Sequence, residues 1–345
     1  MIQPAILGIG TAVPENSCNQ MEICDSLESA FNNRRAPAVF RATEIDKRHI
    51  VQDSLDWYAA NPGNEARLKA YISHAPGLGV EAIRKALDQA QLTPADIDTF
   101  IVASSTGVDT PGLDVKIAES LNMSPYLRRA ALVGMGCQAF MPSLHQATTT
   151  VLARPKSKVL VLTLELCSLH IQHERSIKNI LGSALFADGA SAAVVGNNGT
   201  GGLRLLDSLT YSDYQTQEEM SFHPGETGYK IYLSGKIPEL LRVQVPPLVE
   251  RVLSRNNLQL NDIKHWAVHP GGMRIVDFVE QALELDGNEL QYSRSVLREY
   301  GNMSSATLLF VLERIVLQAR PSPGDFCILL GFGPGLTIEV GLVQW

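Results

Sequence analysis

Short apolar runs alternate along this chain with longer stretches whose apolar residues recur every three or four positions, and this alternation limits the possible folds more than any other feature. Short apolar runs are typical of buried strands, and the periodic stretches are typical of amphipathic helices. Strands that alternate with helices build layered α/β folds. The expected strands are residues 5–9, 99–103, 129–133, 159–164, 190–195, 202–206, 265–268, 326–330 and 336–343. The expected helices are residues 79–90, 139–152, 238–256, 274–285 and 304–320.

One local pattern occurs twice. Residues 96–102 and 262–268 each follow a predicted helix, start with Asp-Ile, continue through an aromatic residue and end a buried strand on Val. A repeat of this kind indicates a duplicated helix–strand unit, with functional loops at equivalent strand ends of the two copies. We therefore expect two similar halves, residues 1–199 and 200–345, with their boundary in the Gly-rich loop 197–202.

Composition and charge exclude several classes of function. The 345 residues include 36 acidic and 29 basic side chains, giving a formal charge of −7 without any long basic run, so a nucleic-acid-binding surface is not expected. No apolar run approaches the roughly 20 residues of a transmembrane helix, and residues 1–5 lack the basic start of a signal peptide. Five scattered cysteines do not suggest a disulfide framework. We expect a cytoplasmic protein that binds neither nucleic acid nor membrane.

Cys137 lies in the most informative stretch of the sequence. A predicted strand breaks at Gly134 and Gly136, and Cys137 follows at the start of a predicted helix. Glycines permit a sharp strand-to-helix turn and let a substrate approach the sulfur closely. The partial positive charge of a helix N-terminus favours a thiolate. A nucleophile is one interpretation, and a small buried cysteine with only a packing role is the other.

His269 and Asn302 are the candidate partners of Cys137. His269 ends a predicted buried strand and is followed by Pro-Gly-Gly, and Asn302 stands just ahead of a predicted helix. A Cys, a His and an Asn at the ends of strands and helices are suited to act as nucleophile, base and oxyanion donor. A helix cap is the alternative role for Asn302.

Two other patterns carry less weight. His170 and His173 have a helical spacing of three, but no cluster of Cys or carboxylate residues accompanies them, so we expect a solvated helix face and no metal site. Gly8 and Gly10 follow the first strand, yet Thr-Ala-Val-Pro replaces the helix and third glycine of a dinucleotide loop, which argues against NAD binding.

Taken together and in order, the motifs resemble those of the type III polyketide synthases, the chalcone and stilbene synthase superfamily. The stretches that carry the resemblance are Gly136-Cys137 followed by Ala139-Phe140, His269-Pro270-Gly271-Gly272, Gly301-Asn302-Met303-Ser304-Ser305 and Gly331-Phe332-Gly333-Pro334-Gly335, with Gly189 in 185–190. The likeness covers essentially the whole chain, from the first strand to the last.

The resemblance implies a thiolase fold, in which two α/β halves form a five-layer αβαβα core, and a homodimer. No permanently bound cofactor or metal is needed, because acyl-CoA and malonyl-CoA substrates supply the chemistry. Cys137 would accept the starter as a thioester, and His269 would hold the thiolate and, with Asn302, stabilise the enolate from malonyl decarboxylation. An enolate needs neutral or cationic donors, and no Asp or Glu directly flanks either motif. Phe186 would be the gatekeeping aromatic between the CoA tunnel and the cavity.

The resemblance also implies a substrate pocket and a CoA entrance. The pocket residues would be Phe186, Ser105, Thr106, Thr110, Cys167, Gly182, Phe222, Ile231, Ser304, Gly333 and Pro334. Thr110 stands in place of a plant Met, and beside Cys167 and Thr106 it resembles bacterial members that open a tunnel for a long acyl chain. Phe222, in place of a Gly, would restrict elongation or turn the chain toward the tunnel. Arg34, Arg35 and Arg41 would meet the CoA phosphates.

We therefore expect iterative decarboxylative condensation of malonyl-CoA onto an acyl-CoA starter, with medium- or long-chain fatty acyl groups favoured and alkylpyrones or alkylresorcinols as products. Three alternatives stay open. An aromatic at Phe222 also resembles tetrahydroxynaphthalene synthases, which start from malonyl-CoA. A ketoacyl-ACP synthase III-like enzyme shares the Cys, His and Asn set, but has His-Gln-Ala-Asn where this chain has His-Pro-Gly-Gly. A catalytically silent thiolase-fold subunit that binds a partner is disfavoured by the intact Cys137, His269 and Asn302.

Overall fold

One mixed sheet organises the molecule. The computed structural model describes residues 2–197 and 202–345, and within these residues the sheet has nine strands in the order β11-β12-β13-β8-β1-β7-β6-β4-β5. The strands are β1 (Pro4–Ala12), β4 (Thr99–Ala103), β5 (Arg128–Leu132), β6 (Val159–Leu166), β7 (Asp188–Asn197), β8 (Leu203–Ser212), β11 (Ile263–Val268), β12 (Phe326–Gly333) and β13 (Thr337–Gln344). Each strand expected from the sequence is present, so these predictions are confirmed.

The helices agree with the sequence less closely. They are α1 (Gln20–Ser26), α2 (Glu28–Phe31), α3 (Ala36–Arg41), α4 (Leu55–Ala59), α5 (Asn64–Ala90), α6 (Leu113–Ser120), α7 (Phe140–Ala153), α8 (Ile177–Leu185), α9 (Ile237–Arg255), α10 (Met273–Ala282), α11 (Gln291–Tyr300) and α12 (Thr307–Arg314). The helix expected at 79–90 is only the second half of α5, which continues through Pro76 back to Asn64. The helix expected at 304–320 is divided into a 3₁₀ turn, α12 and a π-helical turn at Ile315–Ala319.

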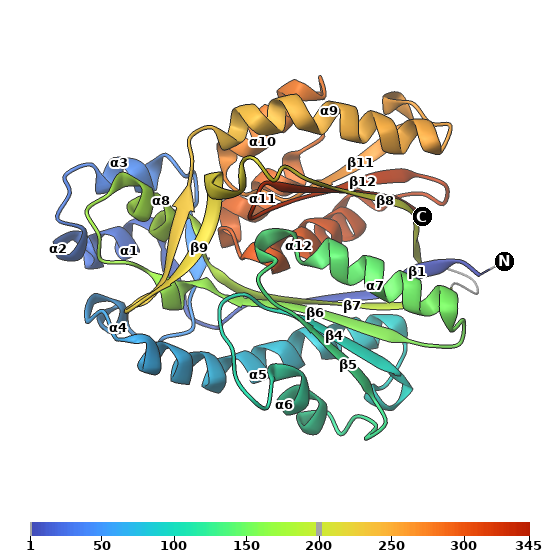
Figure 1. Cartoon of the computed structure of the whole chain (residues 1–345), viewed down its shortest axis with the longest axis horizontal. Helices are drawn as coiled ribbons and strands as arrows, with labels where there is room; N and C mark the ends of the chain where they lie inside the picture. Colours follow the sequence, from blue (N-terminus) through green and yellow to red (C-terminus); the bar gives the residue numbers. More distant parts are fainter. Residues whose placement is uncertain (1, 198–201) are drawn as a thin grey trace.

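The elements stack in five layers, as Figure 1 shows. Helices α9 and α10 cover one outer face, and α5 and α6 cover the other. Between them lie the β11–β12–β13–β8 part of the sheet, a central layer that contains α7 and α12, and the β1–β7–β6–β4–β5 part. Within the part of the chain that the structure describes, the two parts of the sheet are joined where Ala5 and Ile6 of β1 pair with Arg204 and Leu203 of β8. The expected α/β layering is confirmed.

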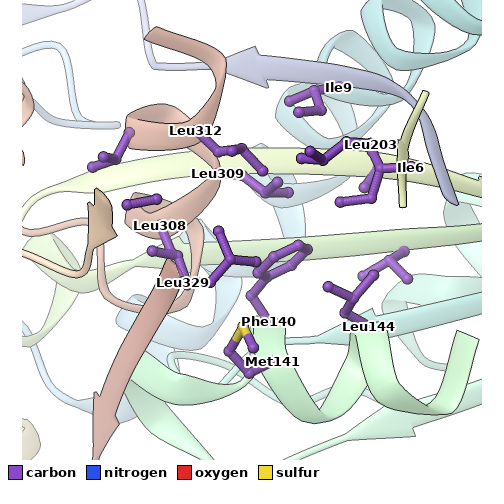
Figure 2. Packing of buried hydrophobic residues seen from close by; sticks show 14 of the residues in the cluster. Ile6, Ile9, Phe140, Met141, Leu144, Leu203, Leu308, Leu309, Leu312 and Leu329 are labelled. Carbon is purple, nitrogen blue, oxygen red and sulfur yellow. The ribbon is translucent and has the colours of Figure 1, made fainter. Parts of the chain in front are cut away.

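The central layer is almost entirely apolar. Phe140, Met141 and Leu144 of α7 face the Leu308, Leu309 and Leu312 side chains of α12 in one buried cluster (Figure 2). A helix that is hydrophobic all round has to be buried on all sides. Helix α12 (Thr-Leu-Leu-Phe-Val-Leu) is buried in this way because it lies between the two parts of the sheet. Because the turn that contains Cys137 leads into α7, this packing anchors the nucleophile candidate to the buried central layer.

Gly8 and Gly10, the pair that resembles part of a dinucleotide loop, lie within β1 and have a packing role there. A Cβ atom at Gly8 or Gly10 would meet the carbonyl oxygens of Ala86 and Ala82 on α5. The glycines therefore let a strand and a long helix pack closely, and Thr11 continues the strand.

The repeated sequence pattern has a repeated structure. In each copy a short 3₁₀ turn, Pro94–Asp96 or Leu260–Asp262, leads into a strand, β4 or β11. In each copy the Asp carboxylate accepts a hydrogen bond from the backbone N–H three residues earlier, at 2.7 Å in the first and 2.8 Å in the second. The resemblance between the two segments is therefore structural as well as sequential. The boundary proposed at 197–202 lies mostly outside the described residues.

A cluster of short elements at one end of the molecule was not anticipated from the sequence. It contains α1 to α4, α8, the two-stranded antiparallel sheet β2–β3 (Ser17–Asn19 and Lys47–His49) and the hairpin β9–β10 (Met220–Gly225 and Gly228–Leu233) (Figure 1). Residues from these elements, among them Leu185 of α8 and Phe222 of β9, lie around the same space as Cys137, His269 and Asn302. Within the described residues, none of the helices has the length and apolar character needed to cross a membrane.

Candidate active site

Cys137 lies in a 3₁₀ turn, Gly136–Gln138, that leads into α7. Gly136 has φ +59°, and a Cβ atom there would lie 2.5 Å from the Cδ of Pro334. Both the left-handed conformation and the close approach of the Gly331–Gly335 segment therefore require glycine. The sulfur is buried, and burial raises the pKa of the Cys137 thiol to about 12, while hydrogen bonds from Ser304 and Asn302 act in the opposite direction. Without a partner base the thiol is protonated.

His269 is the candidate for that base. It follows β11, and its backbone N–H donates to Leu330 at 2.8 Å, which holds it at the strand end. Burial lowers the pKa of His269 to about 4, so the ring is neutral at neutral pH. Neither ring nitrogen has a hydrogen-bond partner among the described residues, although both are buried. A neutral imidazole with free nitrogens can accept a thiol proton and then donate it as a hydrogen bond.

Asn302 is fixed in one orientation. Its Oδ1 accepts a hydrogen bond from the Ser304 N–H at 2.9 Å, and its Nδ2 donates to the Gly271 carbonyl at 3.3 Å. The side-chain N–H₂ therefore points toward the loop after His269, on the cavity side. Its backbone pairs with the segment around Phe186, through Ala187 N–H to Asn302 O and Asn302 N–H to Leu185 O, both at 2.9 Å.

One cavity brings the three residues together. A space of about 140 Å³ is lined by Cys137, His269 and Asn302 at one end. Ala42, Thr43, Ser234, Pro238, Arg274 and Ile275 also line it. Because the partly exposed Arg274 and Ile275 belong to the same lining, the space is an entrance that leads to the sulfur.

A second, larger cavity lies behind the first. It has a volume of about 680 Å³, and Phe186, Met220 and Phe222 line both cavities, so these three side chains form a wall that the cavities share. Of the residues expected in the pocket, its wall contains Phe186, Ser105, Thr106, Cys167, Phe222, Ile231, Ser304 and Pro334. Gly182 lines a small adjoining space with Cys167, Phe186 and Ile231.

Phe222 and Ile231 face each other across the β9–β10 hairpin. They are direct cross-strand partners and therefore point to the same side of it. The Phe222 ring also meets the Phe186 ring edge to face, with 6.1 Å between centroids. The hairpin thus places two of the expected pocket residues next to the Phe186 ring, which is called the aromatic barrier below.

Glu165 is a site residue that sequence reasoning missed. It lies on β6 and is fully buried, and it accepts hydrogen bonds from the Ser105 N–H (2.9 Å), the Thr106 hydroxyl (2.9 Å) and the Ser305 hydroxyl (2.7 Å). Burial raises the pKa of Glu165 to about 7, with these hydrogen bonds opposing it. No carboxylate flanks the His or Asn motif in sequence, but the fold brings this one close enough for its charge to raise the pKa of Cys137. In the sequence, a charged residue inside an otherwise apolar predicted strand was the signal that could have identified Glu165 as a site residue.

Some expected residues lie elsewhere. Thr110 is exposed in the loop after β4 and does not line either cavity with Cys167 and Thr106. Gly333 packs against Gln138 and lines neither cavity. Arg34, Arg35 and Arg41 are exposed, and only Arg41 adjoins the entrance, through its neighbours Ala42 and Thr43.

The expectation that His170 and His173 lie on a solvated helix face was wrong. His170 lies in a short 3₁₀ segment and lines the large cavity, and its ring accepts from the Tyr229 N–H (3.1 Å), bonds to the Thr106 carbonyl (2.7 Å) and stacks on Tyr229. His173 follows the segment and bonds to the Tyr58 carbonyl. The spacing of three indicated a helix face, but the tight turn after β6 directs both rings inward. Among the described residues no group of three or more His, Cys, Asp or Glu is placed to hold a metal ion.

Comparison with known proteins identifies the family. Models of the chalcone and stilbene synthases match residues 3–199 (N-terminal domain) and 213–344 (C-terminal domain). The chain belongs to this family. It is 31% identical to a 3,5-dihydroxyphenylacetyl-CoA synthase of Amycolatopsis orientalis, over 98% of this chain and 92% of the relative. It is also 31% identical to the alpha-pyrone synthesis polyketide synthase-like Pks18 of Mycobacterium tuberculosis, over 97% and 89%.

The solved structures agree. The crystal structure of 1,3,6,8-tetrahydroxynaphthalene synthase from Streptomyces coelicolor A3(2) superposes with a TM-score of 0.93, at 29% identity and over 99% of both chains. This type III polyketide synthase therefore has the thiolase fold that the resemblance implied. It is an acyltransferase that condenses malonyl-CoA, and its family uses CoA thioesters without a bound cofactor.

Proposed function

We propose that this polyketide synthase loads a medium- or long-chain fatty acyl group from acyl-CoA onto Cys137 and extends it with malonyl-CoA to alkylpyrone- or alkylresorcinol-type products. The observation that carries this proposal is the cavity of about 680 Å³ beyond Phe186, which is far larger than a two-carbon starter needs. Each methylene group that leaves water for an apolar cavity contributes about 0.8 kcal/mol of binding free energy. A cavity with room for many methylene groups therefore favours a long acyl chain. The alpha-pyrone synthesis named for the mycobacterial relative supports the product class.

The geometry suits each step of this chemistry. His269 takes the proton of Cys137, and the sulfur attacks the starter thioester and releases CoA. Malonyl-CoA then enters the same space and loses CO₂, and the enolate oxygen receives hydrogen bonds from His269 and the Asn302 N–H₂. The enolate carbon attacks the Cys137 thioester, the Cys137 thiolate leaves, and the lengthened chain on CoA returns to the sulfur for the next cycle.

A malonyl-primed synthase of the tetrahydroxynaphthalene type is the second candidate. Phe222 favours it, because its ring meets the Phe186 ring in the wall that lines both cavities and leaves less room there for a long starter. A starter panel of acyl-CoA thioesters from two to eighteen carbons, each with labelled malonyl-CoA and mass-spectrometric product analysis, separates the two. Turnover that rises with starter length supports the fatty acyl proposal. Product from malonyl-CoA alone, with no incorporation of longer starters, contradicts it.

We also propose that two copies assemble as a homodimer through the β5 edge. Val108 and Val133 line the large cavity, yet their side chains are 61% and 67% exposed, so one chain leaves the wall open there. β5 is the last strand of the sheet and offers its free edge on this side. Thr110 lies in the loop of Val108 and would complete the wall from the second copy. Native mass spectrometry tests this, since a monomer at micromolar concentration would refute it.

For CoA recognition we propose Arg274, which lines the entrance, and Arg41, which directly precedes Ala42 and Thr43 of the same lining, together with Arg34 and Arg35. Arg274 lies in the first turn of α10, where a cation is unfavourable for the helix dipole, and it has no ion pair among the described residues. Replacement by Gln should raise the KM for malonyl-CoA. It should leave the KM for the malonyl thioester of N-acetylcysteamine, which has no phosphate, unchanged. Equal effects on both substrates would refute the assignment.

A further inference from the structure

Arg48 is a buried arginine that the proposed chemistry does not use. It lies on β3, only 1% exposed, and burial lowers the pKa of its guanidinium to about 10, so it stays charged at neutral pH. Burying a charge is unfavourable unless hydrogen bonds compensate for it. The partners of this guanidinium therefore show what the charge is for.

Two of those partners are carbonyl groups at the end of α8. Arg48 Nη1 donates to the carbonyls of Ser183 and Phe186, both at 2.7 Å, and Nε donates to the Gln20 side chain at 2.9 Å. Gln20 in turn donates to the Ala184 carbonyl at 2.7 Å. The last carbonyls of a helix have no partner within the helix, and a cation at this end also complements its dipole. Arg48 and Gln20 thus cap the segment that leads into Phe186.

The same segment holds Asn302. The backbone of Asn302 exchanges hydrogen bonds with Leu185 and Ala187, on either side of Phe186. The stem of Arg48 also packs behind it, because a Cβ atom at Gly301 would lie 3.0 Å from Arg48 Cγ and 3.1 Å from the Ala187 side chain. Any shift of the α8 end therefore moves both the aromatic barrier and the candidate oxyanion donor.

We propose that Arg48 is a positioning residue of the reaction: by holding the Ser183 and Phe186 carbonyls, it sets the place of the Phe186 ring and of the Asn302 carboxamide. This inference rests on the role proposed above for Asn302. Misplacing a catalytic group by about 1 Å costs on the order of 10²-fold in rate. Loss of Arg48 should therefore damage malonyl decarboxylation and leave the Cys137 sulfur itself available.

Arg67 provides the matched control. It is also a buried arginine with a pKa lowered to about 10, and its guanidinium donates to two carbonyls, of Pro62 and Leu169, and to one side chain, Asn61. It does not contact the 183–187 segment or Gly301. Arg67→Met and Arg48→Met therefore remove equivalent sets of hydrogen bonds, and only the second removes the contacts that hold Phe186 and Asn302.

The test measures two rates in the full-length protein. Malonyl-CoA decarboxylation reports on the enolate site, and Cys137 alkylation by iodoacetamide reports on the nucleophile. We expect Arg48→Met to lower the decarboxylation kcat by about 10- to 100-fold, with little change in KM or alkylation rate. Arg48→Lys, which can still reach a carbonyl, should recover part of the loss. Arg67→Met should lose stability but keep the parent ratio of the two rates.

The results separate the two proposals. A parent enzyme that decarboxylates malonyl-CoA, together with an Asn302→Ala variant that does so equally well, would refute the role of Asn302. If Asn302→Ala is impaired but folded Arg48→Met keeps the parent ratio, or if Arg67→Met shows the same change, Arg48 has no positioning role. If Arg48→Met does not fold, Gln20→Leu removes the Ala184 contact and the Nε partner. It should lower decarboxylation selectively, and an unchanged ratio there also overturns the proposal.

Discussion

The raised pKa of Glu165 has a measurable effect on stability. In the unfolded chain the carboxyl has a pKa near 4.5, and in the folded protein it is about 7. The folded state therefore holds an extra proton between these two values. This favourable contribution is complete below pH 4.5 and is lost as the pH rises through about 7. The difference corresponds to about 3 kcal/mol of unfolding free energy.

Glu165→Gln replaces the carboxyl with a neutral group of the same shape. The Gln oxygen can keep the hydrogen bonds from the Ser105 N–H and the Thr106 hydroxyl, and the Ser305 hydroxyl can rotate to accept from the new N–H₂. The variant no longer has to hold a buried negative charge at high pH. Relative to the parent, its unfolding free energy should therefore rise by about 3 kcal/mol between pH 4.5 and pH 8.

Urea denaturation at one fixed protein concentration, repeated at half-unit pH steps, measures this difference. Other buried carboxyls are present in both proteins and cancel. Glu339→Gln is the control, because burial also raises the pKa of Glu339 to about 7, while its carboxylate accepts from the Thr210 hydroxyl and has no bond to Ser105, Thr106 or Ser305. If the difference in unfolding free energy between Glu165→Gln and the parent does not change with pH, the reasoning is refuted. If the difference for Glu339→Gln is also independent of pH, burial does not raise the carboxyl pKa at either site. Because the charge on Glu165 also raises the Cys137 pKa, the variant should be alkylated faster at pH 8.

Further outcomes follow from the site. Cys137→Ala should fold and bind malonyl-CoA but form no acyl-enzyme, and intact-protein mass spectrometry with a labelled starter checks this; a retained adduct would remove Cys137 from its role. His269→Ala and Asn302→Ala should each reduce malonyl decarboxylation by about 10²- to 10³-fold, measured as acetyl-CoA formation, and a small loss would place the donors elsewhere. Phe222→Gly should enlarge the space beside Phe186 and shift the products toward a larger number of condensations. An unchanged product profile by liquid chromatography–mass spectrometry would contradict this role of Phe222. Gly136→Ala should lose at least about 1 kcal/mol of stability from its φ of +59° and lower the rate of Cys137 acylation, so an unaltered melting temperature would contradict the strain.

Much of the scaffold could be predicted because its information is local. Strands β1, β4, β6 and β7 are short apolar runs, and β4 and β11 are preceded by the same Asp-capped turn. Such signals depend only on neighbouring residues, which is why the nine strands were located before any tertiary information. The candidates Cys137, His269 and Asn302 were also visible, because glycines and helix or strand ends next to them are sequence features.

The remaining features depend on contacts between distant residues. The first half of α5 contains Pro76, and distant residues hold it in place: Tyr71 donates to the Ser104 hydroxyl and Arg67 to the Leu169 carbonyl. His170 points inward only because the turn after β6 meets Tyr229 on the β9–β10 hairpin. Thr110 is close in sequence to Thr106 but lies outside the cavity that Thr106 lines.

The sequence alone determined the nine strands of the large sheet, the repeated turn and the candidate groups of Cys137, His269 and Asn302, because each depends on residue type and spacing over a few positions. Only the tertiary structure decided how the groups are tuned. Glu165 reaches Ser305 across 140 positions, and Arg48 reaches Phe186 across 138. Folding removes water from both side chains. This desolvation raises the pKa of Glu165 and makes the burial of the Arg48 charge unfavourable. No local pattern records that desolvation, so the electrostatics of this site appear only when the distant segments have packed together.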